Sequence, residues 1–102
     1  MAPIWVAMLV DLASIEHSVL ADAQQRGQAQ PARIVVSEAV TWRDGSLGCP
    51  EPGRMYPQAL VKGYRIRVQA GAALLEYHAS GSGQWLYCPA ERVTEPLPDD
   101  TK

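Results

Sequence analysis

The two cysteines of the chain, Cys49 and Cys88, are the residues whose chemistry would constrain its function most. Oxidised, they would form a disulfide between a long loop and the last strand. Closing a chain segment of this length stabilises a fold by roughly 3–4 kcal/mol in the chain-entropy model. Reduced, they would pack as small apolar side chains, as buried thiols do in cytosolic proteins. We adopt the disulfide as the prediction.

A third interpretation makes Cys49 a catalytic nucleophile. A reactive thiolate needs a base or a positive neighbour, which His78 would supply if Asp44 or Glu76 oriented its ring. Pro50 directly follows the cysteine and lacks the backbone N–H that could bind an oxyanion. We therefore predict no catalytic residue, and a small thiol-dependent or hydrolytic enzyme that uses Cys49, His78 and Asp44 is the alternative.

Other catalytic and metal-binding patterns are weak. Ser46 lies in Gly-Ser-Leu-Gly rather than in the Gly-x-Ser-x-Gly elbow of serine hydrolases, so we expect it to cap a turn. The four residues His17, Cys49, His78 and Cys88 show none of the paired spacings of metal sites. We predict no metal and no cofactor, with His17 exposed on a helix and His78 on a sheet surface.

The aromatic residues comprise three Trp and four Tyr, with no Phe. Packing within a sheet is the simplest role for most of them. Beside a long loop rich in Gly and Pro, however, such side chains and nearby polar groups could form a contact surface. The residues predicted for this surface are Trp42, Tyr56, Gln58, Tyr64, Arg65, His78 and Trp85.

These side chains must be positioned by a helix and several strands. A helix is expected over residues 8–26, because apolar residues recur there at helical spacing. Its apolar stripe consists of Met8, Leu12, Ile15, Val19 and Ala23. A polar connector with Gly and Pro follows it.

The first strand is expected over residues 33–42, where the apolar period changes to two. One face of this strand would carry Ile34, Val36, Val40 and Trp42. Glu38 interrupts that face and predicts a bulge or an edge position. Residues 43–62 contain several Gly and Pro without periodicity, which predicts a long loop of the kind that is often functional.

A hairpin is predicted from the strands over residues 63–70 and 73–79, because Gly71-Ala72 suits a type II′ turn. If Ala70 pairs with Ala73, the rest of the register follows. The resulting pairs are Val68 with Leu75, Arg67 with Glu76, Ile66 with Tyr77 and Arg65 with His78. One face of the hairpin is then apolar and the other carries complementary charges.

A last strand is expected over residues 84–88, with two registers open. A four-residue loop before it would place Leu86 and Cys88 on the core side, whereas a three-residue loop would place Trp85 and Tyr87 there. The proline-containing tail over residues 91–102 is expected to fray.

These elements predict one α+β domain over residues 1–102. One N-terminal helix would pack on an antiparallel sheet of about four strands, formed by a strand, a long loop and a three-strand meander.

Composition excludes some classes of partner. The chain has 9 Lys and Arg against 11 Asp and Glu, whereas nucleic-acid-binding domains usually carry a basic excess. No run reaches the roughly 18 apolar residues of a membrane span. Residues 4–10 read IWVAMLV and are expected to lead into the helix, or to be the remnant of an export signal.

Several short motifs occur between Arg33 and Cys88. They are WRDGSLGCP at residues 42–50, YPQ at 56–58, GYRI at 63–66 and YH at 77–78, followed by the late cysteine. Together they resemble a family of small uncharacterised bacterial proteins, many of them exported. The sequence departs from the family pattern at Lys62 and Leu75, where the pattern has Pro and Tyr. The resemblance implies a periplasmic or secreted protein and no particular activity; a cytoplasmic location is the alternative.

The leading functional hypothesis is thus a non-catalytic binding module, outside the cytoplasm, that uses the loop over residues 42–63 and nearby Trp and Tyr side chains. Its partner would be a protein or a small ligand. The thiol enzyme and a purely structural domain are the alternatives, and the sequence predicts no oligomeric state.

Overall fold

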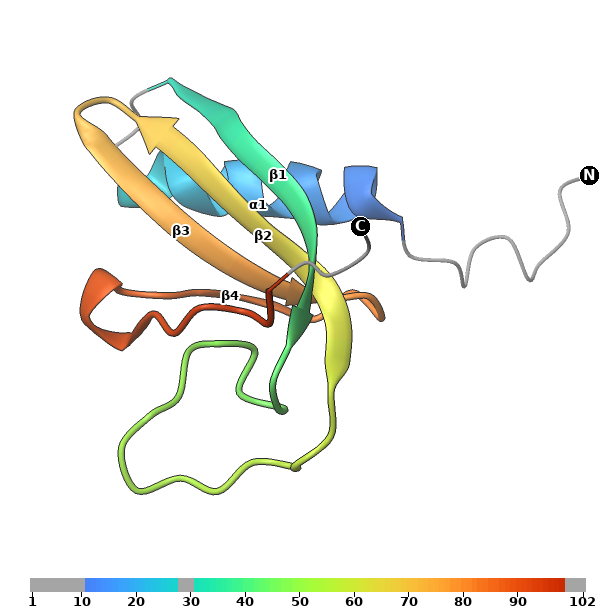
Figure 1. The fold of residues 1–102 in the computed structure, drawn as a ribbon. Coiled ribbons are helices and arrows are strands. Elements are labelled where there is room, and N and C mark those ends of the chain that lie inside the picture. The colour runs from blue at the N-terminus through green and yellow to red at the C-terminus, as the bar shows by residue number, and fades with distance from the viewer. Residues whose placement is uncertain (1–10, 28–30, 99–102) are drawn as a thin grey trace, which may run out of the picture.

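The structure is a computed structural model that describes residues 11–27 and 31–98. One helix, α1 (Leu12–Arg26), lies across one face of a four-stranded antiparallel sheet of order β1-β2-β3-β4 (Figure 1). The strands are β1 (Ala32–Trp42), β2 (Val61–Ala70), β3 (Ala73–Ser80) and β4 (Trp85–Tyr87), and the short 3-10 helix η2 (Ala90–Arg92) follows them. The predicted α+β class is confirmed. Within the described ranges, no helix is long and apolar enough to cross a membrane.

Helix α1 begins at Leu12 because Asp11 caps it. The Asp11 backbone is extended and its carboxylate accepts a hydrogen bond of 3.0 Å from the Ser14 amide. The predicted start at residue 8 was therefore too early, and Met8 lies outside the described residues. The apolar stripe of the helix does face the sheet, where Ile15 and Val19 are buried.

The main hydrophobic core lies between α1 and the sheet. It consists of Ile15, Val19, Ala23, Ile66, Val68, Tyr77 and Ala79. Burying a large apolar side chain contributes about 1.5–3 kcal/mol, so this layer supplies a substantial part of the favourable free energy of folding. No residue of the long loop belongs to this cluster.

The central hairpin has the predicted register throughout. Ala70 lies opposite Ala73, and Ile66 lies opposite Tyr77. On the face opposite the helix, the Arg67 Nε lies 2.9 Å from a Glu76 carboxylate oxygen, which confirms the predicted charge pair.

The β3–β4 hairpin adopts the three-residue alternative. The Ser80 amide donates to the Gln84 carbonyl oxygen, and Trp85 lies opposite Ala79. Trp85 and Tyr87 consequently lie on the helix side of the sheet, where their rings contact Tyr77 edge to face.

Strand β1 departs from the predicted alternation. A bulge lies between Ile34 and Val36, both of which pair with adjacent residues of β2, and Val35 is the extra residue. Ile34 therefore packs on the helix-side core, whereas Val36 lies on the opposite face together with Trp42. The prediction that these residues share one face was wrong at Ile34. Glu38 does lie on an edge strand, but the bulge lies three residues before it.

The tail is docked rather than frayed over its described part. The Thr94 amide donates to the Gly48 carbonyl oxygen, and the Leu97 amide donates to the Thr41 carbonyl oxygen, both at 2.9 Å. An Arg65 Nη1 also lies 2.9 Å from the Glu95 carboxylate. The tail thereby joins the loop to β1 across the face of the sheet opposite α1, which is called the second face from here on.

Candidate functional site

The long loop, residues 43–60, has a folded first half. Asp44 Oδ1 accepts hydrogen bonds from the Ser46 hydroxyl at 2.6 Å and from the Ser46 amide at 2.9 Å. The hydroxyl bond and then the amide bond hold the pKa of Asp44 below its usual value. Ser46 therefore caps a turn, as predicted, and its hydroxyl is committed to Asp44 instead of a base.

Two left-handed residues reverse the chain after this turn. Leu47 has φ 56° and Gly48 has φ 72°. A Cβ on Gly48 would lie 2.5 Å from the Trp42 ring, so only glycine allows the loop to approach this side chain so closely. The reversal presses the loop onto the sheet face opposite the helix.

The sheet face beneath the loop holds a second buried cluster. Trp42, His78, Leu47, Cys49 and Cys88 are each at most 7% exposed. The Trp42 indole N–H donates to the Ala79 carbonyl oxygen at 3.0 Å, and its ring stacks on His78 at a centroid distance of 4.3 Å. Trp42 and His78 were both predicted to belong to a contact surface, but the loop covers them completely.

His78 was predicted to lie on a sheet surface, which is wrong, since it is fully buried. Its Nδ1 lies 2.6 Å from the Leu47 carbonyl oxygen, and its Nε2 lies 2.6 Å from Glu76 Oε2. Burial tends to raise the pKa of Glu76, but hydrogen bonds from His78 and Arg67 outweigh it and keep this pKa below its usual value. The two ring nitrogens thus contact the Leu47 carbonyl oxygen and the Glu76 carboxylate, and the ring joins the loop to β3.

Cys49 and Cys88 lie at disulfide-bonding distance, with their Cα atoms 5.8 Å apart. The bond joins the end of the folded loop half to the segment after β4. It also removes the thiol dyad from this arrangement, because the Cys49 sulfur is bonded and both His78 nitrogens have other partners. Glu76 does contact His78, as one of the two proposed orienting residues, whereas Asp44 does not.

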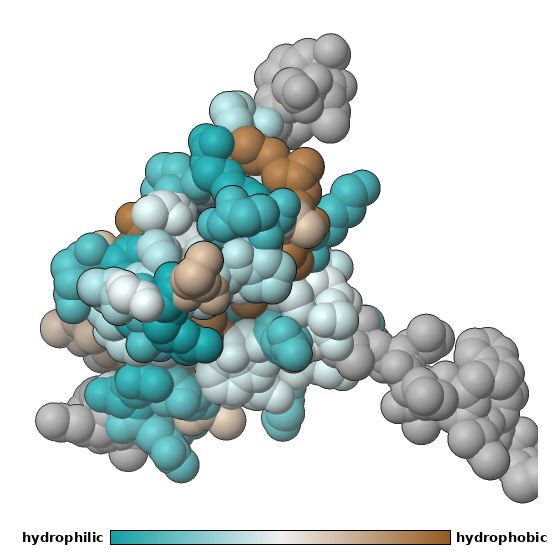
Figure 2. Space-filling view, turned by 90° about the horizontal axis from the view of Figure 1, so that it is seen from below, coloured by the Kyte–Doolittle hydropathy of each residue, from teal (hydrophilic) through white to brown (hydrophobic). Residues whose placement is uncertain are grey.

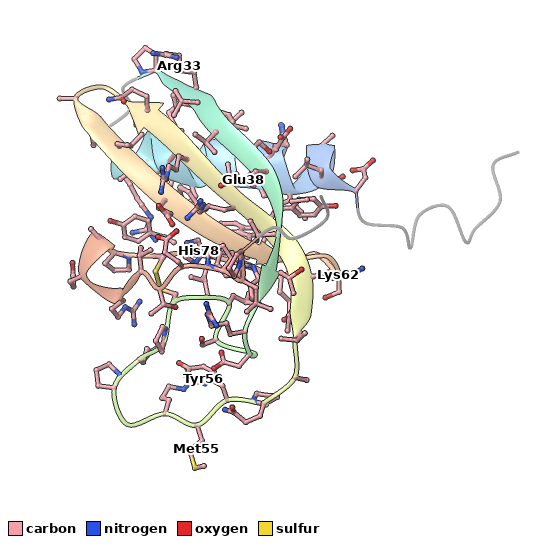
Figure 3. The ribbon with its side chains drawn as sticks, in the orientation of Figure 1. Arg33, Glu38, Met55, Tyr56, Lys62 and His78 are labelled. Carbon is pink, nitrogen blue, oxygen red and sulfur yellow. A yellow bond between two sulfur atoms is a disulfide. The ribbon has the colours of Figure 1, made fainter. Side chains whose placement is uncertain are left out.

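The second half of the loop, residues 51–60, is exposed and is called the loop tip here. Met55 is 94% exposed and Leu60 is 66% exposed. Figure 3 shows Met55 at the far end of the loop, pointing away from the domain, with Tyr56 turned inward. Figure 2 looks onto this end of the molecule and shows a mostly hydrophilic surface, with a group of hydrophobic side chains in the upper part of the view.

The loop tip is held by polar contacts within the loop. The Tyr56 hydroxyl accepts a hydrogen bond from the Glu51 amide at 3.0 Å, and the Gln58 side chain donates to the Tyr56 carbonyl oxygen at 3.2 Å. The Gly45 amide donates to the Pro57 carbonyl oxygen at 2.9 Å and joins the tip to the folded half. Tyr56 is thus half-buried, and Gln58 serves the loop itself.

Of the remaining predicted contact residues, Tyr64 and Arg65 lie apart from the loop tip. Tyr64 packs partly against the helix-side core, and Arg65 is bridged between Glu38 and Glu95. Trp85 is on the helix side of the sheet, so it does not adjoin His78. His17 is exposed on α1, as predicted. No group of three potential metal ligands occurs in residues 11–27 and 31–98.

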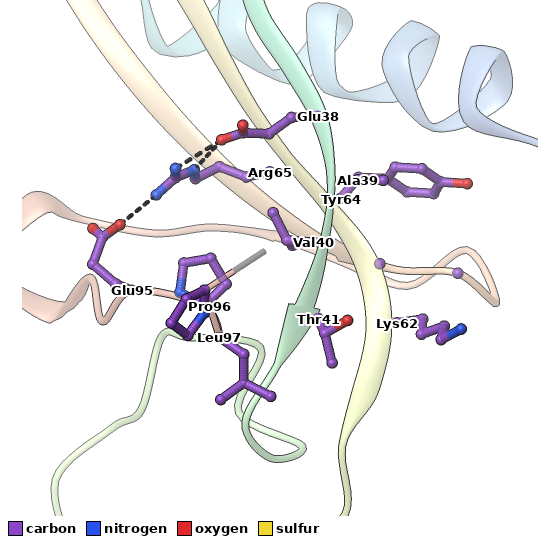
Figure 4. A pocket seen from close by; sticks show the side chains of 13 residues that line it. Glu38, Ala39, Val40, Thr41, Lys62, Tyr64, Arg65, Glu95, Pro96 and Leu97 are labelled. Carbon is purple, nitrogen blue, oxygen red and sulfur yellow. Dashed lines mark hydrogen bonds and ion pairs between the residues drawn. The ribbon is translucent and has the colours of Figure 1, made fainter. Parts of the chain in front are cut away.

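Two hollows adjoin these residues. One of about 280 Å³ lies between the loop and β4 and is lined by Tyr56, Trp85, Arg54 and Arg92, among others. The other, about 740 Å³, runs beside β1 and the docked tail (Figure 4). Glu95 and Leu97, which line the second hollow, were missed by sequence reasoning, because the proline-rich tail gave no periodic signal.

Comparison with known proteins identifies a family for this chain. A family model described as a domain of unknown function, DUF8738, matches residues 16–88. No curated protein and no solved structure matches the chain.

Proposed function

The chain belongs to the DUF8738 family, and from the geometry of its loop we propose that it is a non-catalytic binding module that contacts a partner protein outside the cytoplasm. The loop tip, residues 51–60, forms the contact surface. The observation that carries this proposal is a firmly anchored loop whose tip exposes large apolar side chains.

Exposure of these side chains is unusual for this chain. Among the described residues, the exposed large apolar side chains are Val35, Met55, Leu60 and Leu74, and the two on the loop tip are the most exposed. Methionine adapts its shape to an apolar partner surface, and contacts of this kind are common where one surface binds another protein. Leaving these side chains in water has no structural benefit to the loop.

Anchoring makes the loop suitable for binding. The disulfide, the His78 bond to Leu47 and the Thr94 bond to Gly48 all hold the folded half of the loop against the sheet. Ordering a flexible loop on binding reduces affinity, whereas a loop that is already ordered avoids most of that loss. The second face of the sheet thus serves as a platform for the tip.

A protein partner is favoured over a small ligand at this site. The hollow next to the loop tip measures about 280 Å³. Ligand pockets usually measure about 300–1,000 Å³ and enclose most of their ligand. A partner that also covers the exposed Met55 and Leu60 uses the surface more fully.

The paired cysteines support a location outside the cytoplasm. Structural disulfides persist in oxidising compartments and are rare in the cytosol. The predicted location is therefore periplasmic or secreted. Mass spectrometry after alkylation without reductant, on protein matured in its native host, should detect no free thiol, and two alkylated cysteines would contradict this location.

The contact surface is tested by site-specific photo-crosslinking. A benzophenone side chain at position 55 should capture one protein from the extracytoplasmic fraction of the host, and that protein, once purified, should bind the isolated chain. Met55→Ser with Leu60→Ser should weaken binding at least tenfold. Val35→Ser with Leu74→Ser is the matched control, because it removes two exposed apolar side chains away from the loop. Equal loss from both pairs would refute the assignment to the loop tip.

A further inference from the structure

The outer edge of β1 has backbone groups that face away from the sheet. β1 is an edge strand, and its Thr41 carbonyl oxygen accepts from the Leu97 amide of the tail rather than from β2. Residues in an antiparallel strand alternate between those whose backbone groups face the neighbour and those whose groups face away. Ser37 and Ala39 therefore face outward together with Thr41.

The tail uses only the end of this edge. Pro96 and Pro98 flank Leu97 and have no N–H, so Leu97 alone of the three can donate to β1. Between the bulge at Val35 and the tail contact at Thr41, a window of residues 36–40 remains. In the described part of the chain, the structure places no other backbone hydrogen bond on this outer edge.

Residues 38–40 of the window line the hollow of about 740 Å³. The rest of the lining comes from Thr41, residues 62–65 of β2, Gly81 and residues 95–98 of the tail. Figure 4 shows Glu38, Arg65 and Glu95 on one side of β1, near Val40 and the tail, with Lys62 on the other side. A strand is about 3.3 Å long per residue, so the window accommodates about five residues of an extended chain.

The charges next to the window favour a basic side chain. Arg65 contacts Glu38 Oε2 at 2.7 Å and Glu95 Oε1 at 2.9 Å, so one guanidinium is shared by two carboxylates. The second oxygen of each carboxylate has no protein partner among the described residues. Arg43 is directed at the backbone carbonyl of Glu95, not at its carboxylate. With side chains 43% and 69% exposed, Glu38 and Glu95 remain accessible to a further cation.

We infer that the edge of β1 binds an extended peptide segment of a partner protein, which adds a fifth strand to the sheet and places a Lys or Arg opposite Glu38. Backbone hydrogen bonds to Ser37 and Ala39 hold such a segment, and the basic residue provides selectivity. A second copy of the chain, paired over the same window, would set two Glu38 carboxylates opposite each other, which is unfavourable. This inference concerns a surface separate from the loop tip and does not depend on the function proposed above.

A peptide whose sequence reads the same in both directions tests the inference whether it pairs parallel or antiparallel to β1. The pentapeptide Val-Thr-Lys-Thr-Val, with blocked ends, places its Lys opposite Glu38, and Val-Thr-Glu-Thr-Val is its control. Titration into the full chain, followed by amide NMR, should shift the signals of Ser37 and Ala39 saturably. The Lys peptide should bind roughly two- to fivefold more tightly than the Glu peptide, the effect of one cross-strand charge pair.

Two variants separate the backbone and charge contributions. Ala39→Pro removes an outward N–H and leaves the bonds between β1 and β2 intact, so peptide binding should be lost. Glu38→Gln with Glu95→Gln should abolish the preference for the Lys peptide and retain weak binding. Should Ala39→Pro fail to fold, the double variant still tests the inference, through its loss of preference for the Lys peptide over the Glu peptide.

Other occupants give distinct results, each of which would overturn the inference. If the Ser37 and Ala39 signals shift with protein concentration alone, a second copy pairs at this edge. If the peptide binds only after removal of residues 99–102, the C-terminal residues of the chain itself compete for this edge. Shifts confined to the loop tip, or equal affinity for both peptides in the unmodified chain, would also refute a selective site at β1.

Discussion

Breaking the bond between Cys49 and Cys88 should cost the protein a large part of its stability and affect mainly one face of the sheet. The two residues are 39 positions apart in the sequence. In the chain-entropy model a loop of this length stabilises the fold by about 4 kcal/mol. Single domains typically have a free energy of unfolding of only about 5–15 kcal/mol, so the bond contributes a large fraction of the stability of the fold.

The assay compares oxidised and dithiothreitol-reduced protein of unchanged sequence by urea unfolding. Both samples contain the same heavy atoms in the second buried cluster, so the difference in unfolding free energy reports mainly the cross-link rather than lost packing. The dependence on urea should also become steeper on reduction, because an unfolded chain without the cross-link exposes more surface. Cys49→Ala with Cys88→Ala should show the same loss plus a smaller packing loss.

Amide hydrogen exchange should locate the effect. The helix-side core contains neither cysteine and no loop residue, so amides of Val19 and Val68 should stay protected in the reduced protein. Amides of Cys49 and Thr94, whose bonds hold the folded half of the loop, should exchange faster. A stability loss below about 1 kcal/mol, or uniform loss of protection across both faces, would refute this reasoning.

Three further predictions follow from contacts elsewhere in the fold. Gly63→Ala should lower the free energy of unfolding in urea by about 3 kcal/mol or more, because its Cβ would lie 1.9 Å from the Ala79 carbonyl oxygen. Gly53→Ala is the control: its Cβ would meet open space, so the loss should be only about 1–2 kcal/mol, caused by the positive φ. Equal losses would contradict the close approach. His78→Phe should lose about 3 kcal/mol, because the buried Glu76 carboxylate is left without one of its partners. Glu76→Gln should lose less, because the group it leaves without an ionic partner, the Arg67 guanidinium, has a side chain 34% exposed to water. Since the fold lowers the pKa of Glu76 from its ordinary value of 4.5, the stability it contributes is complete above that pH and is lost as the pH falls through the lowered pKa. Unfolding measured between pH 5 and pH 2 should thus show a shallower acid dependence for Glu76→Gln, and unchanged slopes would rule out this contribution.

The local elements of this fold could be predicted from sequence. In the hairpin of β2 and β3, the turn at Gly71-Ala72 and the alternation on either side select one register, and the structure has that register. The contacts involved join residues close in the chain, so the pattern of side chains alone determines which pairs meet. The helix stripe facing the sheet was predictable for the same reason, although the cap at Asp11, rather than hydrophobicity, sets where the helix begins.

The bulge in β1 could not be predicted in this way. Apolar residues precede and follow Val35 without a break, so the pattern gave no sign of where the extra residue lies. Its position is decided by pairing with β2, which lies beyond the long loop. The consequence is that Ile34 packs under the helix and that Ser37 and Ala39 present their backbone groups outward.

The second face of the sheet shows most clearly what only tertiary structure decides. From its alternation, His78 was expected at a polar surface, and the same pattern correctly placed it away from the helix. Whether that face meets water depends on Leu47, 31 residues earlier, whose carbonyl oxygen covers the ring. The sequence by itself therefore determined one helix, four strands and their local pairing, because these depend on short-range periodicity. Coverage of the second face, and with it the anchored loop tip and the edge of β1, depends on contacts between distant segments that no local pattern encodes.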